Sequence, residues 1–198
     1  MSPKPTPFYY LLGAVSLPFV HVLYRLETRG LENLPAGGGY VLAANHTSNL
    51  DPWPLGMPLW PRRFLRFMAK SELYWWPLTY LLNGAGAFPV RRGQADLEAI
   101  ETGATLARSG HVVAMFPEGT RQRKGLRKRH EARPRTGAAR IALDAGVPLV
   151  PAAIRGTDRL ARLGRLKVAY GAPLPPEGTP QELTVRLMTE IERLYETL

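Results

Sequence analysis

The sequence lacks cysteine altogether. This absence excludes disulfide bonds, thiolate metal sites and a cysteine nucleophile. The chain also has no Gly-x-Ser-x-Gly motif, so a covalent serine mechanism is unsupported. It has neither a complete Gly-x-Gly-x-x-Gly motif after a strand nor a Gly-Lys-Ser/Thr loop, so dinucleotide and P-loop nucleotide sites are unsupported as well.

Acidic residues are fewer than basic ones. The 16 Asp and Glu residues stand against 26 Lys and Arg residues, which gives a formal net charge of +10. This excess favours an anionic partner, such as nucleic acid, an anionic bilayer or a phosphorylated substrate. Most of the basic residues are arginine, whose planar guanidinium can hold a phosphate through two parallel hydrogen bonds.

Uncharged runs are too short to cross a bilayer as one helix, which takes about 20 residues. The run from Phe8 to Tyr24 has 17 residues and contains Pro18, which would bend a helix. No small-residue cleavage site follows it, which argues against a signal peptide. A core helix is one alternative. We predict instead that residues 1–30 form a membrane-associated helical anchor in the bilayer interface.

A second uncharged segment covers residues 73–90 and is rich in aromatic side chains. It is interrupted by Pro77 and Gly84, so it does not read as a spanning helix. Four basic residues precede it: Arg62, Arg63, Arg66 and Lys70. Basic and aromatic residues together favour contact with anionic headgroups, and an ordinary core helix with a solvated basic face is the alternative.

Strand and helix patterns alternate along the rest of the chain. Buried strands are expected at residues 40–44, 111–116, 147–154 and 166–170. Helices are expected from residue 51, at 94–109, at 136–145 and from residue 179, where Thr179 and Glu182 form a capping box. The pattern predicts a single α/β domain over residues 31–198, with a mixed, largely parallel central sheet flanked by helices.

The segment from Asn45 to Asp51 follows the first of these strands. His46 is expected where the strand ends, and Asp51 where a helix begins, capping it with Pro52 in the first turn. A loop between them can fold the carboxylate onto the imidazole. Asp51 would then hold one ring nitrogen as N–H while the other takes a proton. Alternatively, either residue simply caps or hydrogen-bonds a turn.

A second polar loop, with Glu118 and Gly119, follows the strand at residues 111–116. Ligands of parallel sheets bind at the carboxyl ends of strands, so the two loops are expected at one edge. Such a set suits proton removal from an alcohol whose molecule is held by an anionic group. The spacing of His46, Asp51 and Glu118 matches no common ligand pattern, so we predict no metal.

Four segments resemble the 1-acylglycerol-3-phosphate acyltransferase family in order and spacing. Residues 45–51 resemble its Asn-His-x4-Asp signature. Residues 86–92 resemble the second block, 116–121 the third and 147–151 the fourth. The resemblance covers about residues 31–171.

The resemblance implies transfer of a fatty acyl group to the sn-2 hydroxyl of lysophosphatidic acid, giving phosphatidic acid in phospholipid biosynthesis. The donor would be acyl-CoA or acyl-carrier protein, with no other cofactor and no acyl-enzyme. His46 would be the general base and Asp51 would orient it. The family's N-terminal helices lie in the membrane, so the chain is expected at the cytoplasmic face of the inner membrane, peripheral or monotopic.

The resemblance also implies a site for the glycerol phosphate. The residues expected to bind it are Arg92, Glu118, Gly119, Thr120, Arg121 and Arg135. Arg135 stands where the family usually has a lysine, and Gln122 where it commonly has serine. These departures leave open an acyltransferase that acts on another lysolipid.

The segment from Arg121 to Arg135 contains eight Lys or Arg residues. Nucleic-acid binding is therefore a second alternative, but the segment lacks interleaved aromatic residues. We expect it to dock on anionic lipid or on an acidic carrier protein, and we expect no nucleic-acid partner.

Overall fold

The structure is a computed structural model and describes residues 5–90, 97–119 and 134–198. Its strands are β1 (Glu27–Arg29), β2 (Tyr40–Ala44), β3 (Leu65–Lys70), β4 (Ala87–Val90), β5 (Val112–Met115), β6 (Leu149–Arg155) and β7 (Lys167–Tyr170). These described strands form one sheet in the order β1-β7-β6-β2-β5-β3-β4. Only β6 and β7 pair antiparallel among them. The predicted α/β fold with a mixed, mostly parallel sheet is confirmed.

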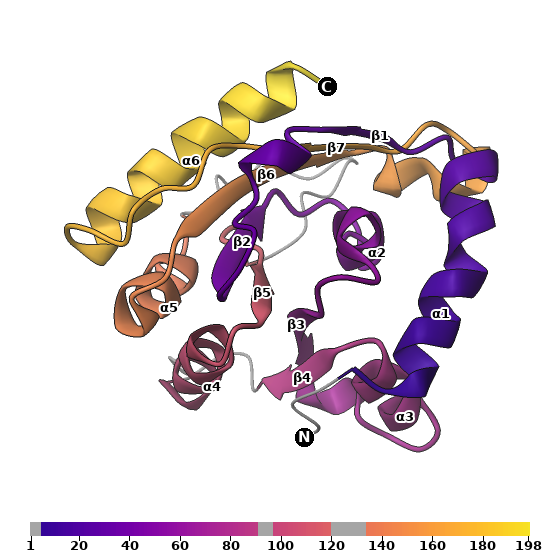
Figure 1. Ribbon diagram of the computed structural model, residues 1–198, viewed down its shortest axis with the longest axis horizontal. Coiled ribbons are helices and arrows are strands. Elements are labelled where there is room, and N and C mark those ends of the chain that lie inside the picture. Colours follow the sequence, from indigo (N-terminus) through magenta and orange to yellow (C-terminus); the bar gives the residue numbers. More distant parts are fainter. Residues whose placement is uncertain (1–4, 91–96, 120–133) are drawn as a thin grey trace, which may run out of the picture.

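Helices cover both faces of this sheet (Figure 1). The helices are α1 (Pro7–Pro18), α2 (Pro52–Gly56), α3 (Leu78–Gly84), α4 (Leu97–Arg108), α5 (Gly137–Ala145) and α6 (Pro180–Glu196). A π-helical turn, η1 (Phe19–Leu23), continues α1, and short 3-10 turns are η2 (Leu31–Asn33), η3 (Met57–Leu59), η4 (Ser71–Leu73) and η5 (Thr157–Arg162). Helices α4, α5 and α6 lie on one face, and α1 and α2 lie on the other.

The central strand β2 is buried on both faces, which is why its sequence is a continuous apolar run. Val41 and Ala43 pack in the core beneath α4, α5 and α6, whereas Leu42 and Ala44 pack in the core on the α2 side. The predicted capping box at the start of α6 is present, with Thr179 and Glu182 bonding each other's backbone N–H groups. The sequence pattern therefore predicted β2 and the start of α6 correctly.

Three strands were missing from the prediction: β1, β3 and β4, the last of which lies at the end of the uncharged segment at residues 73–90. β1 comes from the segment assigned to the anchor and pairs parallel with β7. β3 contains Arg66, which we expected at a headgroup-facing surface. That expectation is wrong, because Arg66 is 3% exposed and its guanidinium lies over the Phe64 ring, 4.9 Å from the centroid. The arginines in and beside β3 hid its strand character in the sequence.

The helix predicted at residues 94–109 is confirmed as α4, but the large apolar residue at its start is not buried. Leu97 is exposed, and the buried residues of the helix are Ala99, Gly103, Ala104 and Ala107. Small side chains let α4 approach α5 closely: a side chain at Gly103 would collide with Ile141. The packed face is therefore set by small residues rather than by the larger Leu97.

Helix α1 is docked onto the α/β domain. The Tyr9 ring packs edge-on against Phe64 at 4.6 Å, and its hydroxyl donates to the Arg63 carbonyl oxygen at 3.2 Å. Gly84 of α3 lies against the Phe8 ring, so the two apolar segments are neighbours. Among the helices of the described ranges, none combines the length and apolar character needed to cross a bilayer.

Candidate active site

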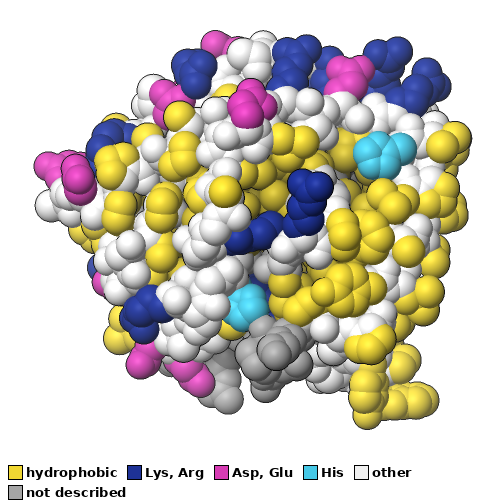
Figure 2. Space-filling view, viewed as in Figure 1, with side chains coloured by type: hydrophobic (Ala, Val, Ile, Leu, Met, Phe, Trp, Pro, Cys, Tyr) yellow, Lys and Arg dark blue, Asp and Glu magenta, His cyan; other side chains and the backbone are white. Residues whose placement is uncertain are grey.

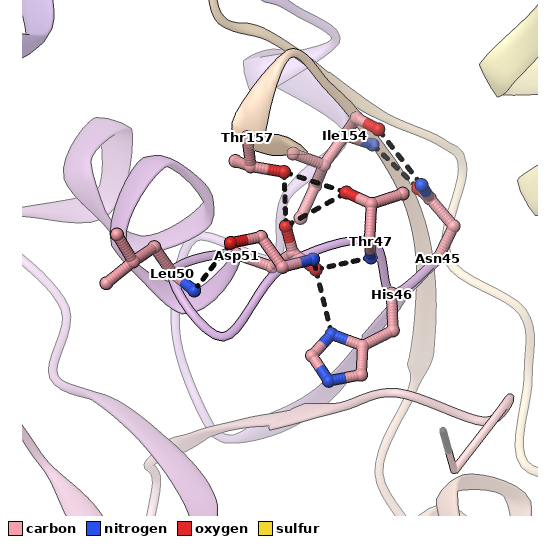
Figure 3. Close-up of polar contacts among 8 residues, drawn as sticks. Asn45, His46, Thr47, Leu50, Asp51, Ile154 and Thr157 are labelled. Atoms are coloured by element: carbon pink, nitrogen blue, oxygen red, sulfur yellow. Dashed lines mark hydrogen bonds and ion pairs between the residues drawn. The ribbon is translucent and has the colours of Figure 1, made fainter. Parts of the chain in front are cut away.

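The loop between β2 and α2 brings His46 and Asp51 together. His46 Nδ1 lies 2.8 Å from Asp51 Oδ2, as the loop was predicted to allow (Figure 3). Both side chains are buried, and Asp51 is 0% exposed. The same oxygen accepts hydrogen bonds from the backbone N–H groups of Thr47 and Ser48, at 2.7 and 2.9 Å. The carboxylate thus organises the loop that carries the imidazole.

Asp51 does not cap α2 through its side chain, contrary to the prediction. It precedes the helix, and Pro52 lies in the first turn as expected, but its carboxylate makes no capping hydrogen bond. The carboxylate turns back toward residues 46–48 instead, because two backbone N–H groups and an imidazole converge there. Its function in the fold is to close this loop.

The other carboxylate oxygen of Asp51 accepts a hydrogen bond from a residue 106 positions further along the chain. Thr157 Oγ1 donates to Asp51 Oδ1 at 2.5 Å and lies 2.8 Å from Thr47 Oγ1. Sequence reasoning missed Thr157. The only signal for it was its position just past the strand at residues 147–154, at the expected ligand edge.

Asn45 fastens the loop to β6. Its Nδ2 donates to the Ile154 carbonyl oxygen at 2.9 Å, and its Oδ1 accepts from the Ile154 N–H at 2.8 Å. The sequence indicated Asn45 only as a member of the motif, without this role. The paired bonds fix the backbone immediately before His46.

Phe116 covers one face of the His46 ring, with centroids 4.4 Å apart and an interplanar angle of 23°. Because Asp51 Oδ2 already accepts two N–H groups, it acts as an acceptor toward Nδ1, which then carries the hydrogen. The other ring nitrogen, Nε2, keeps its lone pair and lies on the side of the ring away from Asp51 (Figure 3). This is the arrangement of a general base and its orienting acid.

The loop after β5 lies at the same edge, because β5 pairs parallel with β2. Glu118 is buried there, and Gly119 has a positive φ of 65°. Arg135 is held against this loop: its backbone N–H donates to the Pro117 carbonyl oxygen at 2.7 Å, and its side chain lies directly over Gly119. A Cβ on Gly119 would come within 2.7 Å of Arg135 Nε. Close approach of the guanidinium therefore requires glycine.

The structure describes five of the predicted site residues. His46 and Asp51 lie in one loop, and Glu118, Gly119 and Arg135 lie at the next. Arg92, Thr120 and Arg121 lie outside the described residues, as does the basic segment up to residue 133. Within the described ranges, no three His, Asp or Glu side chains are grouped so as to hold a metal ion. That no metal takes part stays a prediction.

Comparison with known proteins identifies the family. Residues 25–155 match the model of a family described as Acyltransferase. The 1-acyl-sn-glycerol-3-phosphate acyltransferase of Bacillus subtilis is 35% identical over 149 residues, which cover 72% of this chain and 70% of that protein. The human 1-acyl-sn-glycerol-3-phosphate acyltransferase alpha is 31% identical over 183 residues, which cover 84% of this chain and 62% of that protein.

The fold has a counterpart among solved structures. The crystal structure of the 1-acyl-sn-glycerophosphate (LPA) acyltransferase PlsC from Thermotoga maritima superposes with a TM-score of 0.69 at 23% identity, covering 93% of this chain and 76% of that chain. The family match spans both the β2–α2 loop and the loop after β5. The chain belongs to the acyltransferase family and is an acyltransferase.

Proposed function

We propose that the protein transfers a fatty acyl group from acyl-CoA or acyl-carrier protein to the sn-2 hydroxyl of lysophosphatidic acid, forming phosphatidic acid. The names of the relatives support this acceptor. The observation that carries the mechanism is the 2.8 Å contact between His46 Nδ1 and Asp51 Oδ2 in a chain of this family.

The reaction follows from the orientation of the imidazole. His46 Nε2 takes the proton from the hydroxyl while the hydroxyl oxygen attacks the thioester carbonyl carbon. The tetrahedral intermediate then expels the thiolate, which recovers the proton from the imidazolium. A thioester is already activated, so no acyl-enzyme is needed, and the base contributes about 10²–10⁴-fold.

Phosphate binding is assigned to the second loop. The exposed side chain of Arg135 lies against Gly119, and its guanidinium can bind a phosphate through two parallel hydrogen bonds. We assign Arg92, Thr120 and Arg121 to the same headgroup on the strength of the family resemblance. Glu118, beside this group, would orient an arginine or accept from a glycerol hydroxyl.

An exposed apolar surface on α1, η1 and the α3 region supports association with a bilayer. Its exposed members are Phe8, Tyr10, Leu11, Val15, Phe19, Val22, Trp75, Trp76 and Tyr80. Figure 2 shows hydrophobic side chains gathered on the right and lower right, over α1 and α3. Contiguous exposed apolar side chains of this kind mark interaction surfaces. We propose that this surface rests in the bilayer interface at the cytoplasmic face of the inner membrane, where the lipid acceptor resides; β1, from the end of the segment assigned to the anchor, belongs to the sheet instead.

The catalytic proposal is tested with purified His46→Ala, assayed with acyl-CoA and with acyl-carrier protein against a panel of lysolipids. We expect a loss of about 10²-fold or more, because the base is removed. His21→Ala, at an exposed position in η1, is the matched control and should keep normal turnover. Near-normal turnover of His46→Ala would refute the base. A wild-type preference for a lysolipid other than lysophosphatidic acid would reassign the acceptor.

The membrane proposal is tested by vesicle flotation of Leu11→Glu and Val15→Glu. Each puts a charge on the exposed face of α1, so binding to anionic vesicles should fall. The control is Val185→Glu on α6, on the opposite face of the sheet, where the wild-type side chain is 67% exposed. Equal binding by all three variants and the wild-type protein would refute the surface.

A further inference from the structure

Thr157 occupies a position that the family signature segments do not include. It follows Gly156 at the end of β6 and opens η5. Gly156 has a φ of 101°, and a side chain there would collide with the backbone oxygen of Arg165. This turn directs Thr157 back beneath the β2–α2 loop, where it is 3% exposed.

The hydrogen bonds of Asp51 divide into two sets. On Oδ2, the three donors are His46 Nδ1 and the backbone N–H groups of Thr47 and Ser48, all within five residues of Asp51. On Oδ1, the close donor is Thr157 Oγ1 at 2.5 Å, from 106 residues away, and Thr47 Oγ1 lies at 3.3 Å.

A hydroxyl has one hydrogen to donate, which fixes the direction of this network. The 2.5 Å bond assigns the Thr157 hydrogen to Asp51, so Thr157 Oγ1 accepts from Thr47 Oγ1 at 2.8 Å. Thr157 thereby fixes the rotation of the carboxylate about its Cβ–Cγ bond. The rotation of that plane decides whether Oδ2 points at the imidazole.

We propose that Thr157 is a positioning residue for acyl transfer: it locks the Asp51 carboxylate so that His46 presents Nε2 to the acceptor hydroxyl. The inference rests on the proposed role of His46 as the base. Thr157 touches neither the reacting atoms nor the His46 ring in this network (Figure 3). Its effect should therefore appear in turnover rather than in substrate affinity.

The test compares Thr157→Val, which keeps the shape but loses the hydroxyl, with Thr157→Ser, which keeps the hydroxyl. Thr157→Val should lower kcat by about 10- to 100-fold with KM nearly unchanged, because a hydrogen bond to a charged group is lost. Thr157→Ser should retain most of kcat. If Thr157→Val does not fold, Thr157→Ala replaces it in the same comparison.

Thr184→Val is the matched control for losing a buried threonine hydroxyl. Thr184 is 5% exposed in α6, and its hydroxyl donates to the Pro180 carbonyl oxygen at 2.6 Å, away from the site. This variant should keep kcat even if it loses stability. A fall in kcat equal to that of Thr157→Val would overturn the inference.

A spectroscopic measurement separates positioning from the activity itself. In the full chain labelled with ¹⁵N-histidine, the Nδ1–H resonance of His46, identified by its loss in His46→Ala, should shift or broaden in Thr157→Val and stay in Thr157→Ser. Three results would each refute the positioning role of Thr157. They are an unchanged His46 resonance in Thr157→Val, a normal kcat in Thr157→Val, and a Thr157→Ser variant as impaired as Thr157→Val. If His46→Ala stays active, the base assignment fails, whatever the resonance of Thr157→Val shows.

Discussion

Replacing Asp51 with Asn separates the charge of this residue from its structural contacts. Asp51 Oδ2 accepts hydrogen bonds from two backbone N–H groups, which can only donate. Oδ1 faces the hydroxyls of Thr47 and Thr157, which can rotate and can therefore either donate or accept. The Asn side chain should therefore keep its oxygen on the Oδ2 side and donate its NH₂ to the hydroxyls. The loop and the His46 tautomer should survive.

The lost negative charge should reduce the rate. When His46 takes the proton, an imidazolium forms beside Asp51, with Nδ1 and Oδ2 2.8 Å apart. Two unit charges whose centres are about 4 Å apart attract by about 4 kcal/mol at an effective dielectric constant of about 20. At about 1.4 kcal/mol per factor of ten, Asp51→Asn should lower kcat by roughly 10³-fold.

Asp51→Ala should lower the stability of the protein more than Asp51→Asn, because it removes the hydrogen-bond acceptor of the β2–α2 loop. The partly buried N–H groups of Thr47 and Ser48 would lose their partner, at about 1–3 kcal/mol each. Urea unfolding should therefore show Asp51→Ala destabilised by about 2–6 kcal/mol, and Asp51→Asn by about 1 kcal/mol.

The measurements are initial rates with acyl donor and lysophosphatidic acid, and urea midpoints of the same preparations. Turnover of Asp51→Asn close to that of the wild-type protein would refute the electrostatic argument. Equal stability of the Asn and Ala variants would refute the structural argument. It would mean that the two backbone N–H groups do not need an acceptor at position 51.

Three further predictions concern the second loop, a helix cap and the pH dependence of stability. Gly119→Ala should raise KM for lysophosphatidic acid with little change in kcat, because the new Cβ displaces Arg135; unchanged KM in steady-state assays would contradict this. Thr179→Ala should lower the free energy of unfolding by about 1 kcal/mol in urea and leave turnover intact, since it removes the α6 cap. Burial lowers the pKa of His111 below its ordinary value of 6.5, and the neighbouring charges of Arg66 and Arg63 lower it further. The stability that comes from keeping His111 neutral is therefore fully present above pH 6.5. It is lost as the pH falls through the pKa of His111 in the folded protein. His111→Gln should flatten this acid-side slope, and an unchanged slope in urea unfolding at several pH values would count against it.

The strand pairing explains why the two loops lie side by side. β2 and β5 are parallel neighbours, with Ala43 opposite Met115, so the segments that follow the two strands lie side by side, and the rings of His46 and Phe116 stack there. Removing water from one face of the imidazole in this way strengthens its contact with Asp51. Arg135 is bonded to the second loop through Pro117, and this bond accompanies the placement of its guanidinium over Gly119.

The sequence determined the geometry of the β2–α2 loop because the main contacts of this loop are local. Three hydrogen bonds to Asp51 Oδ2 come from residues at most five positions away, so a strand, a short loop and a helix start were enough to predict that His46 meets Asp51. The apolar run of β2 and the capping box of α6 are likewise readable from neighbouring residues.

Tertiary structure alone decided what surrounds that loop. Thr157 and Ile154 reach the loop from more than 100 residues away, and they do so only because β6 becomes the parallel neighbour of β2. Burial of Arg66 follows in the same way from the placement of β3 between β5 and β4. Local backbone preferences are encoded by adjacent residues, whereas the choice of neighbouring strands is a property of the whole packed sheet.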